Sequence, residues 1–189
     1  MYEIEPHFNW RHLYRAEDDP KSPFYKREYS EISFTHTIYN HYIHPQWDSI
    51  DSATLYLKLL YTNYELGFCI VEMMGEWNDT LYNDGMYLKR NFVDHLVEQG
   101  INKFILIGEN ILNFHSSDID YYEEWFEDIE NGWITCVNFR NHVIDEIEAA
   151  RMDYYMALGG ALDEINWRSL GPKKLFEKVN GLIMKRLPM

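Results

Sequence analysis

Four polar residues in a row, His115, Ser116, Ser117 and Asp118, are the best candidates for chemistry in this sequence of 189 residues. A histidine beside hydroxyls and a carboxylate offers the groups of acid–base or nucleophilic catalysis. Neighbouring positions on a turn seldom align a Ser–His hydrogen bond, and the sequence marks no third group to orient the imidazole. We therefore expect no catalytic residue. The enzyme alternative is a small acid–base or hydrolytic site of His115, Glu76 and Asp118.

The two serines and Asp118 are also good helix N-cap residues, because their side-chain oxygens accept hydrogen bonds from free helix N–H groups. Apolar residues follow them at helical spacing, which predicts a helix that starts on this polar cluster. Before the cluster, the apolar run Phe104–Ile107 lies between Gly100 and Gly108 and is typical of a buried strand. We expect a central strand, a loop at the sheet edge and then a helix.

The predicted helix is both acidic and aromatic. Carboxylates recur from Asp118 to Glu130, and Tyr121, Glu124 and Trp125 lie among them. A run of charges usually forms a solvated face. An aromatic and acidic surface also suits a basic protein partner, and the sequence leaves both roles open.

Composition restricts the partners of the chain. A formal net charge of −14 repels phosphate backbones, so nucleic acid is a poor partner. Hydrophobic residues make up 46% of the chain, which is enough for a core. No stretch approaches the ~20 apolar residues of a membrane span, and the N-terminus has no signal-peptide pattern. Cys69 and Cys136 lie in apolar runs, as free buried thiols do. We expect a cytoplasmic protein without membrane contact.

Metal and cofactor motifs are missing from the sequence. His36, His41, His44 and Asp48 are close enough to suggest a metal site, but no cysteine partner and no H-E-x-x-H pattern accompany them. No G-x-G-x-x-G or Walker motif occurs, so nucleotide binding has no support. We expect neither a metal nor a cofactor.

The order of the predicted elements indicates an α/β fold in one domain, residues 1–189. A β-hairpin, residues 54–62 and 68–74, precedes alternating helices and strands. We therefore expect a mixed sheet of four to five strands, in which the later strands are parallel and right-handed crossovers join them. The predicted core spans residues 54–157 and a C-terminal helix spans 165–189. Within the core we expect a helix over 84–99, a strand over 133–139 and a helix over 140–158.

Residues 1–51 are predicted to form an arm or an added strand on this domain, because they have too few apolar positions for a core of their own. Apolar and polar residues alternate from Ile32 to Ile38, which predicts a half-buried strand. Its apolar face must be buried somewhere. We expect Trp47, Tyr56 and Tyr61 to help close the arm onto the sheet.

From Phe68 to about Met152 the pattern resembles a STAS domain, the fold of the bacterial anti-sigma-factor antagonists. Gly75-Glu76-Trp77-Asn78-Asp79 stands where the family has a Gly-Glu-Leu-Asp-like turn after a strand. Phe114-His115-Ser116-Ser117-Asp118 stands where the family has an apolar residue and then Asp-Ser-Ser-Gly at the start of a helix. The strand and the helix that follow also match the closing pattern of the family.

The resemblance implies a STAS-like core and a phosphorylation switch at the second serine of the motif, Ser117. His115 replaces the family's Asp, and Asp118 replaces its Gly. A phosphate here would face the carboxylates of the acidic helix, and no lysine or arginine lies between Lys103 and Arg140 to offset them. We therefore expect Ser117 to be a structural residue that is not phosphorylated.

Together these patterns predict a non-catalytic, STAS-like interaction module for a protein partner with a basic surface, and a homodimer is compatible with them. The alternative is a small-molecule or lipid-binding protein with an aromatic pocket between the core and the arm. The expected contact surface consists of Glu76, Asn78, His115, Ser116, Ser117, Asp118, Tyr121, Glu124 and Trp125.

Overall fold

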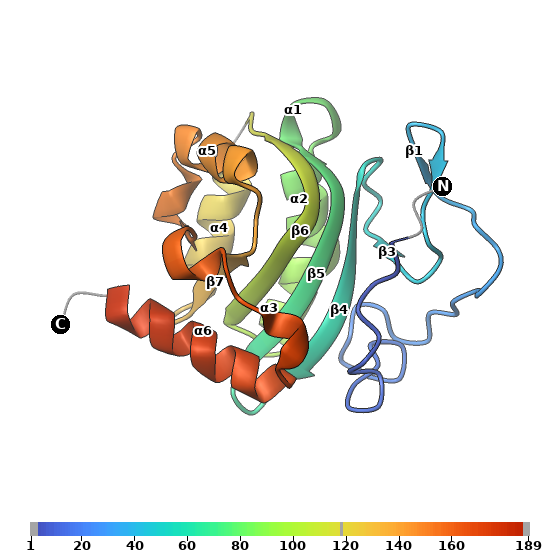
Figure 1. Ribbon diagram of the computed structural model, residues 1–189, viewed down its shortest axis with the longest axis horizontal. Coiled ribbons are helices and arrows are strands. Elements are labelled where there is room, and N and C mark those ends of the chain that lie inside the picture. Colours follow the sequence, from blue (N-terminus) through green and yellow to red (C-terminus); the bar gives the residue numbers. More distant parts are fainter. Residues whose placement is uncertain (1–3, 118, 187–189) are drawn as a thin grey trace.

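The chain folds around a six-stranded mixed β-sheet with the strand order β3-β4-β5-β6-β7-β8 (Figure 1). The structure is a computed structural model that describes residues 4–117 and 119–186. Strands β3, β4 and β5 are antiparallel neighbours, and β5 to β8 run parallel. The strands are β3 (Asp48–Ser49), β4 (Leu55–Asn63), β5 (Phe68–Asn78), β6 (Lys103–His115), β7 (Trp133–Val137) and β8 (Met156–Ala157).

The predicted α/β class and the mixed sheet are confirmed. The sheet exceeds the expected four to five strands because the two-residue strands β3 and β8 extend its edges. β4 and β5 form the predicted hairpin. β6 is much longer than the predicted Phe104–Ile107, because it continues beside β5 as far as His115. It passes Gly108, where an added Cβ would lie 2.2 Å from the ring of Phe139.

Helices α2 to α5 pack on one face of the sheet through a large apolar cluster. The predicted helix over 84–99 is confirmed, although the π-helical turn η1 (Lys89–Val93) interrupts it. The predicted helix over 140–158 ends early, since Arg151 adopts a left-handed φ of 60° and the chain turns into β8. The helices are α1 (Asp79–Tyr82), α2 (Asp84–Leu88), α3 (Asp94–Glu98), α4 (Asp120–Asp128) and α5 (Asn141–Ala149), followed by the 3-10 turn η2 (Met152–Tyr154).

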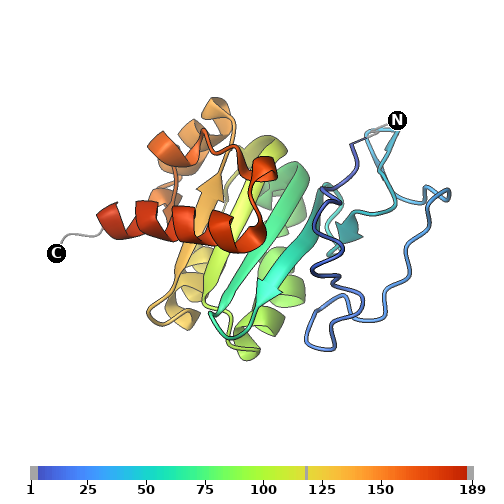
Figure 2. The ribbon, with the colours of Figure 1, turned by 60° about the horizontal axis from the view of Figure 1, so that its bottom comes forward.

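The opposite face of the sheet is covered by α6 (Pro172–Arg186), which crosses it as Figure 2 shows. The ring of Phe176 on α6 stacks on Phe68 of β5, with 4.1 Å between the ring centroids. Beside α6, the short turns η3 (Gly160–Leu162) and η4 (Trp167–Ser169) close the same apolar cluster. The sheet is therefore buried on both sides.

The N-terminal arm lies alongside the β4 edge of the sheet (Figure 1). Its only strands in the described residues besides β3 are β1 (Thr37–Ile38) and β2 (His41–Tyr42), which form a small hairpin. The predicted strand from Ile32 to Ile38 is therefore wrong over most of its length, and Ile32 is 89% exposed. Alternation alone did not form a strand over residues 32–36, because no strand of the described residues pairs with this part of the segment.

Contacts between the arm and the sheet follow the expectation from the sequence. Trp47 and Tyr56 share a buried apolar cluster with Met74 of β5. Tyr61 packs edge-on against Tyr14 of the arm, with ring centroids 5.9 Å apart. The prediction that these aromatic residues close the arm onto the sheet is confirmed.

Candidate functional site

The parallel pairing of β5 with β6 brings the two motif-bearing loops together. Asn78 pairs with His115 in the register, so the turn after β5 and the Ser116–Ser117 loop after β6 meet at the carboxyl ends of these two central strands. The hydroxyl of Thr80 donates to the carbonyl of Ser116 over 3.2 Å and links the two loops directly. We call these strand ends, with their two loops, the β5–β6 end.

The serines of the loop do not cap α4. The helix begins at Asp120, Ile119 holds the N-cap position, and within the described residues no side chain accepts a capping hydrogen bond there. The predicted capping role of Ser116 and Ser117 is therefore wrong, and Asp118 lies outside the described residues. His115 and Ser117 are exposed, so their side chains lie on the outside of the β5–β6 end.

Two of the expected contact residues shape the β5–β6 end from within. Asn78 is buried and caps α1, because its Oδ1 accepts a hydrogen bond of 3.0 Å from the amide of Leu81. Glu76 is also buried, and its carboxylate accepts from the hydroxyl of Tyr39 at 2.6 Å and from the amide of Asn113 at 3.2 Å. The arm thus reaches the site through Tyr39.

The histidine–carboxylate pair of the enzyme alternative is not assembled with Glu76. In the described part of the chain no hydrogen bond joins His115 to Glu76, whose carboxylate is already engaged by the arm and by β6. The other acid of that alternative, Asp118, is not among the described residues. The geometry of Glu76 therefore offers His115 no acid–base partner.

The expected α4 residues separate into core and surface. Trp125 is 1% exposed and packs edge-on against Phe104, so it supports the helix from the core and is not open to a partner. Tyr121 and Glu124 are partly exposed and face Arg90 of η1. The Arg90 guanidinium donates to both carboxylate oxygens of Glu124, at 2.6 and 2.7 Å, and these bonds lower the pKa of Glu124.

A buried cation also stands beside the acidic helix. Lys89 is 1% exposed, and its ammonium donates to Asp128 at 2.7 Å, to Glu124 at 3.4 Å and to Asp94. Burial alone would lower the pKa of Lys89, but these hydrogen bonds raise it above its ordinary value. The sequence has no lysine or arginine between Lys103 and Arg140, but the fold brings Lys89 and Arg90 to this helix. The two cations come from η1, far away in the sequence, where no local pattern identifies them.

Carboxylates that could share a metal ion are found on α3 and α4 and not in the arm. In the described ranges the oxygens of Asp94, Glu124 and Asp128 converge. The ammonium of Lys89 already places a positive charge among them. Asp48, which the sequence grouped with three histidines, is buried and accepts instead from Arg27 at 3.0 Å and Tyr29 at 2.6 Å.

Sequence reasoning missed a buried carboxylate at the centre of the sheet. Glu72 of β5 is 1% exposed and accepts a hydrogen bond of 2.8 Å from the backbone amide of His7. Arg168 lies 3.4 Å from its other oxygen and also bonds Glu109 of β6. Burial raises the pKa of Glu72 to about 7. The single acid inside the apolar run of β5 was the signal that could have located this cluster.

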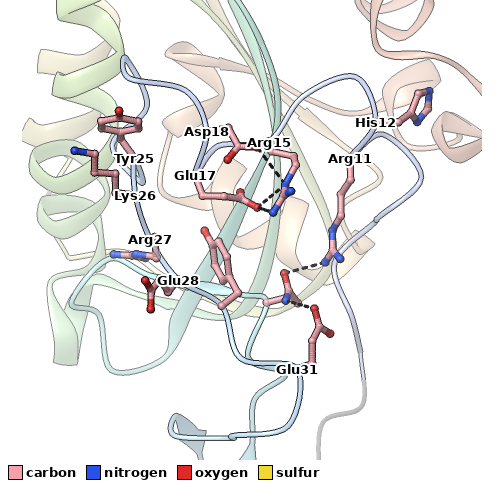
Figure 3. A pocket seen from close by; sticks show the side chains of 12 residues that line it. Arg11, His12, Arg15, Glu17, Asp18, Tyr25, Lys26, Arg27, Glu28 and Glu31 are labelled. Atoms are coloured by element: carbon pink, nitrogen blue, oxygen red, sulfur yellow. Dashed lines mark hydrogen bonds and ion pairs between the residues drawn. The ribbon is translucent and has the colours of Figure 1, made fainter.

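A pocket of about 1150 Å³ lies within the arm and is lined by charged side chains (Figure 3). The side chains of Arg15 and Glu17 meet over it in an ion pair of 2.8 Å. Arg11 donates to Gln46 at 2.9 Å, and Arg27 is engaged by Asp48. This pocket is not the aromatic one expected for a lipid or apolar ligand, and carboxylates or amides already hold its arginines.

Comparisons with known proteins find likeness in structure only. No family model and no curated protein matches the chain. A structure of the anti-sigma factor antagonist SpoIIAA in its unphosphorylated form aligns at 12% identity and a TM-score of 0.47, over 66% of this chain and 96% of that one. A putative anti-sigma factor antagonist from Thermotoga maritima aligns at 14% identity and a TM-score of 0.41, over 59% of this chain and 87% of that one.

The phosphorylated form of the Bacillus cell fate determinant SpoIIAA aligns at 10% identity and a TM-score of 0.42, over 65% of this chain and 98% of that one. The three aligned structures share 10–14% identity with this chain. No helix in the described ranges is long and apolar enough to cross a membrane.

Proposed function

We propose that this protein is a non-catalytic interaction module whose partner binds the β5–β6 end together with the first turn of α4. The observation that carries the proposal is the pairing of Asn78 with His115, which brings two loops from distant parts of the chain together. Beneath them Trp77 and Tyr122 are buried and hydrogen-bonded to each other. Exposed loops on a rigid support suit recognition, because little conformational freedom is lost on binding.

The partner surface that fits the β5–β6 end is basic. Asp120 and Glu123 lie exposed in the first turn of α4, and the whole chain carries a net charge of −14. Arg90, which lies over the ring of Tyr121 on α4, is held by Glu124. Opposite charges accelerate encounter and select against acidic partners, which accounts for the choice of a basic surface.

The test is affinity capture of partners from a lysate of the native host, followed by binding measurements on the recovered partner. The variant Ser117→Lys with Asp120→Lys reverses the local charge without touching the buried network. A matched control, Ser169→Lys with Glu177→Lys, makes the same change in charge at exposed positions near and on α6. We expect the loop variant to lose the partner by roughly tenfold or more in affinity, as disruption of central contacts does, and the control to retain it.

Equal binding by the loop variant and the control would remove the β5–β6 end from consideration. Circular dichroism and thermal melting of both variants verify that each is folded, so that lost binding is not lost structure.

A further inference from the structure

A second surface lies at the opposite end of the parallel strands, beside the edge strand β8. Trp133 opens β7 and pairs with Lys103 at the start of β6, far from the carboxyl ends that form the β5–β6 end. A groove of about 670 Å³ is lined here by the end of α4, the start of β7, η2 with β8, and α6. We call it the β8 groove. It is independent of the surface in the proposed function.

The β8 groove gathers exposed apolar side chains from three elements. Tyr154 of η2 is 79% exposed, Met184 of α6 is 49% exposed and Phe126 of α4 is 41% exposed, and all three line the groove. Tyr155 joins them, with its ring 5.8 Å from that of Phe126 and 5.3 Å from that of Tyr154. Large apolar groups that converge on one hollow of a surface mark an interaction site, whereas isolated ones do not.

The rim of the β8 groove is acidic. Glu148 and Asp153 line it. The one cation among the lining residues is Arg186, whose guanidinium donates hydrogen bonds to the backbone carbonyls of Leu158 and Gly159. The groove therefore presents aromatic surface inside a net negative rim.

We propose that the β8 groove binds a basic segment of a partner protein that carries an apolar anchor. The anchor packs among Phe126, Tyr154 and Met184, while lysine or arginine side chains meet Glu148 and Asp153. This combination of an apolar centre and a charged rim is the arrangement of specific peptide sites. A second copy of the chain would bring its own acidic rim against this one, and anionic lipid headgroups meet the same repulsion.

The test uses a fluorescein-labelled synthetic peptide of alternating lysine and leucine residues, titrated with the full chain at physiological salt and followed by fluorescence anisotropy. Peptides of alternating lysine and serine, and of alternating glutamate and leucine, separate the charge from the anchor. The groove variant is Asp153→Lys with Tyr154→Ala. Its matched control is Glu65→Lys with Leu66→Ala, an exposed acidic and apolar pair in the β4–β5 turn.

We expect the lysine–leucine peptide to bind the wild type and the control equally well, and the groove variant roughly tenfold or more weakly. The wild type should bind the lysine–serine and glutamate–leucine peptides no more tightly than the groove variant binds the lysine–leucine peptide. The affinity would come from net charge, and the proposal would be overturned, in either of two cases. The wild type binds the lysine–serine peptide as tightly as the lysine–leucine peptide, or the control loses as much affinity as the groove variant. Absent binding of the lysine–leucine peptide overturns it too. If ultracentrifugation shows that the wild type and the control self-associate and the groove variant does not, the occupant of the groove is a second copy of the chain.

Discussion

The indole N–H of Trp77 donates a hydrogen bond of 2.7 Å to the hydroxyl of Tyr122, and so joins the end of β5 to the first turn of α4. That hydroxyl donates in turn to Oδ2 of Asp79 at 2.6 Å, while Oδ1 of Asp79 accepts from the amide of Gly85 at 2.6 Å. All these groups are buried. One tyrosine hydroxyl therefore holds the two loops of the β5–β6 end at a fixed spacing.

Replacing Tyr122 with Phe should lower the free energy of unfolding by about 2 kcal/mol, because it leaves the indole N–H of Trp77 buried without its acceptor and removes the hydrogen bond to Asp79. Urea denaturation followed by circular dichroism measures the change. The control Tyr121→Phe, at a partly exposed neighbouring position, should stay within about 0.5 kcal/mol of the wild type. Similar losses in both variants would contradict a supporting role for the Tyr122 hydroxyl.

Removing the buried ammonium of Lys89 should be more costly than removing the exposed guanidinium beside it. Lys89→Met leaves three converging carboxylates without their buried cation, which should lower the free energy of unfolding by about 3 kcal/mol. Arg90→Met deletes a charge that is 46% exposed in its side chain, for a loss of less than about 1 kcal/mol. Denaturant titration of both variants compares them, and equal losses would refute the difference in burial as the cause.

Local sequence patterns were sufficient for the hairpin, the helix over 84–99 and the parallel strands, because each depends on apolar spacing and on nearby turn residues. These patterns did not predict contacts between residues that are distant from each other in the sequence. Arg90 meets Glu124 across 34 positions, and only the packing of η1 against α4 brings the two together. Likewise, polar residues such as Asn113 do not look like strand residues, but β5 supplies a paired backbone that keeps them in β6.

The candidate site was predictable as a pair of loops and not as individual side-chain roles. The motif around Ser117 follows the end of β6, as the predicted order of strand, loop and helix implied, and the pairing of β5 with β6 places it beside the turn after β5. Trp125 fitted an aromatic surface by its spacing, yet its place on the inner side of α4 puts it in the core. Periodicity shows which residues share a face of a helix, but here it did not tell which face is covered.

Deleting residues 1–45 should destabilise the chain and expose apolar surface. Ile38 and Ile43 of the arm are buried with Tyr56 and Met74, and Trp10 fills the opposite cluster beside Trp167. The truncated chain should bind an apolar dye such as ANS strongly and aggregate on heating. A truncated chain that remains monomeric and melts at the temperature of the full chain would show that these contacts contribute nothing to stability.

Ser117→Ala should change the free energy of unfolding by less than about 0.5 kcal/mol, because the exposed hydroxyl does not cap α4. We also expect Ser117 to carry no phosphate in the cell. The adjoining helix presents Asp120 and Glu123 in its first turn, and the guanidinium of Arg90 beside this helix is held by Glu124. Intact-mass measurement and peptide mapping of protein from the native host check this. Substantial phosphate on Ser116 or Ser117 would restore the switch that the family resemblance implies.

Stability should depend on pH through Glu72, the buried acid to which the arm and η4 both bind. Its pKa is raised from 4.5 to about 7 in the folded chain. Between these values the folded chain retains a proton that the unfolded chain has lost, so the free energy of unfolding falls as the pH rises. The loss of stability caused by ionisation of the buried Glu72 is complete above pH 7 and absent below pH 4.5. The groups that face Glu72 are the His7 amide, Arg168 and Glu109, and none of them reverses this direction.

Glu72→Gln should therefore remove this part of the pH dependence, since a neutral amide keeps the shape of the protonated acid. Relative to the wild type, the variant should gain stability from pH 4.5 to pH 7, by at most on the order of 3 kcal/mol at the upper end. Urea denaturation of both proteins at a series of pH values measures the difference, with the exposed Glu177→Gln as the control. Parallel stability curves for wild type and Glu72→Gln would mean that Glu72 ionises in the folded chain as readily as in the unfolded one, and that its contact with the arm is not sensitive to pH.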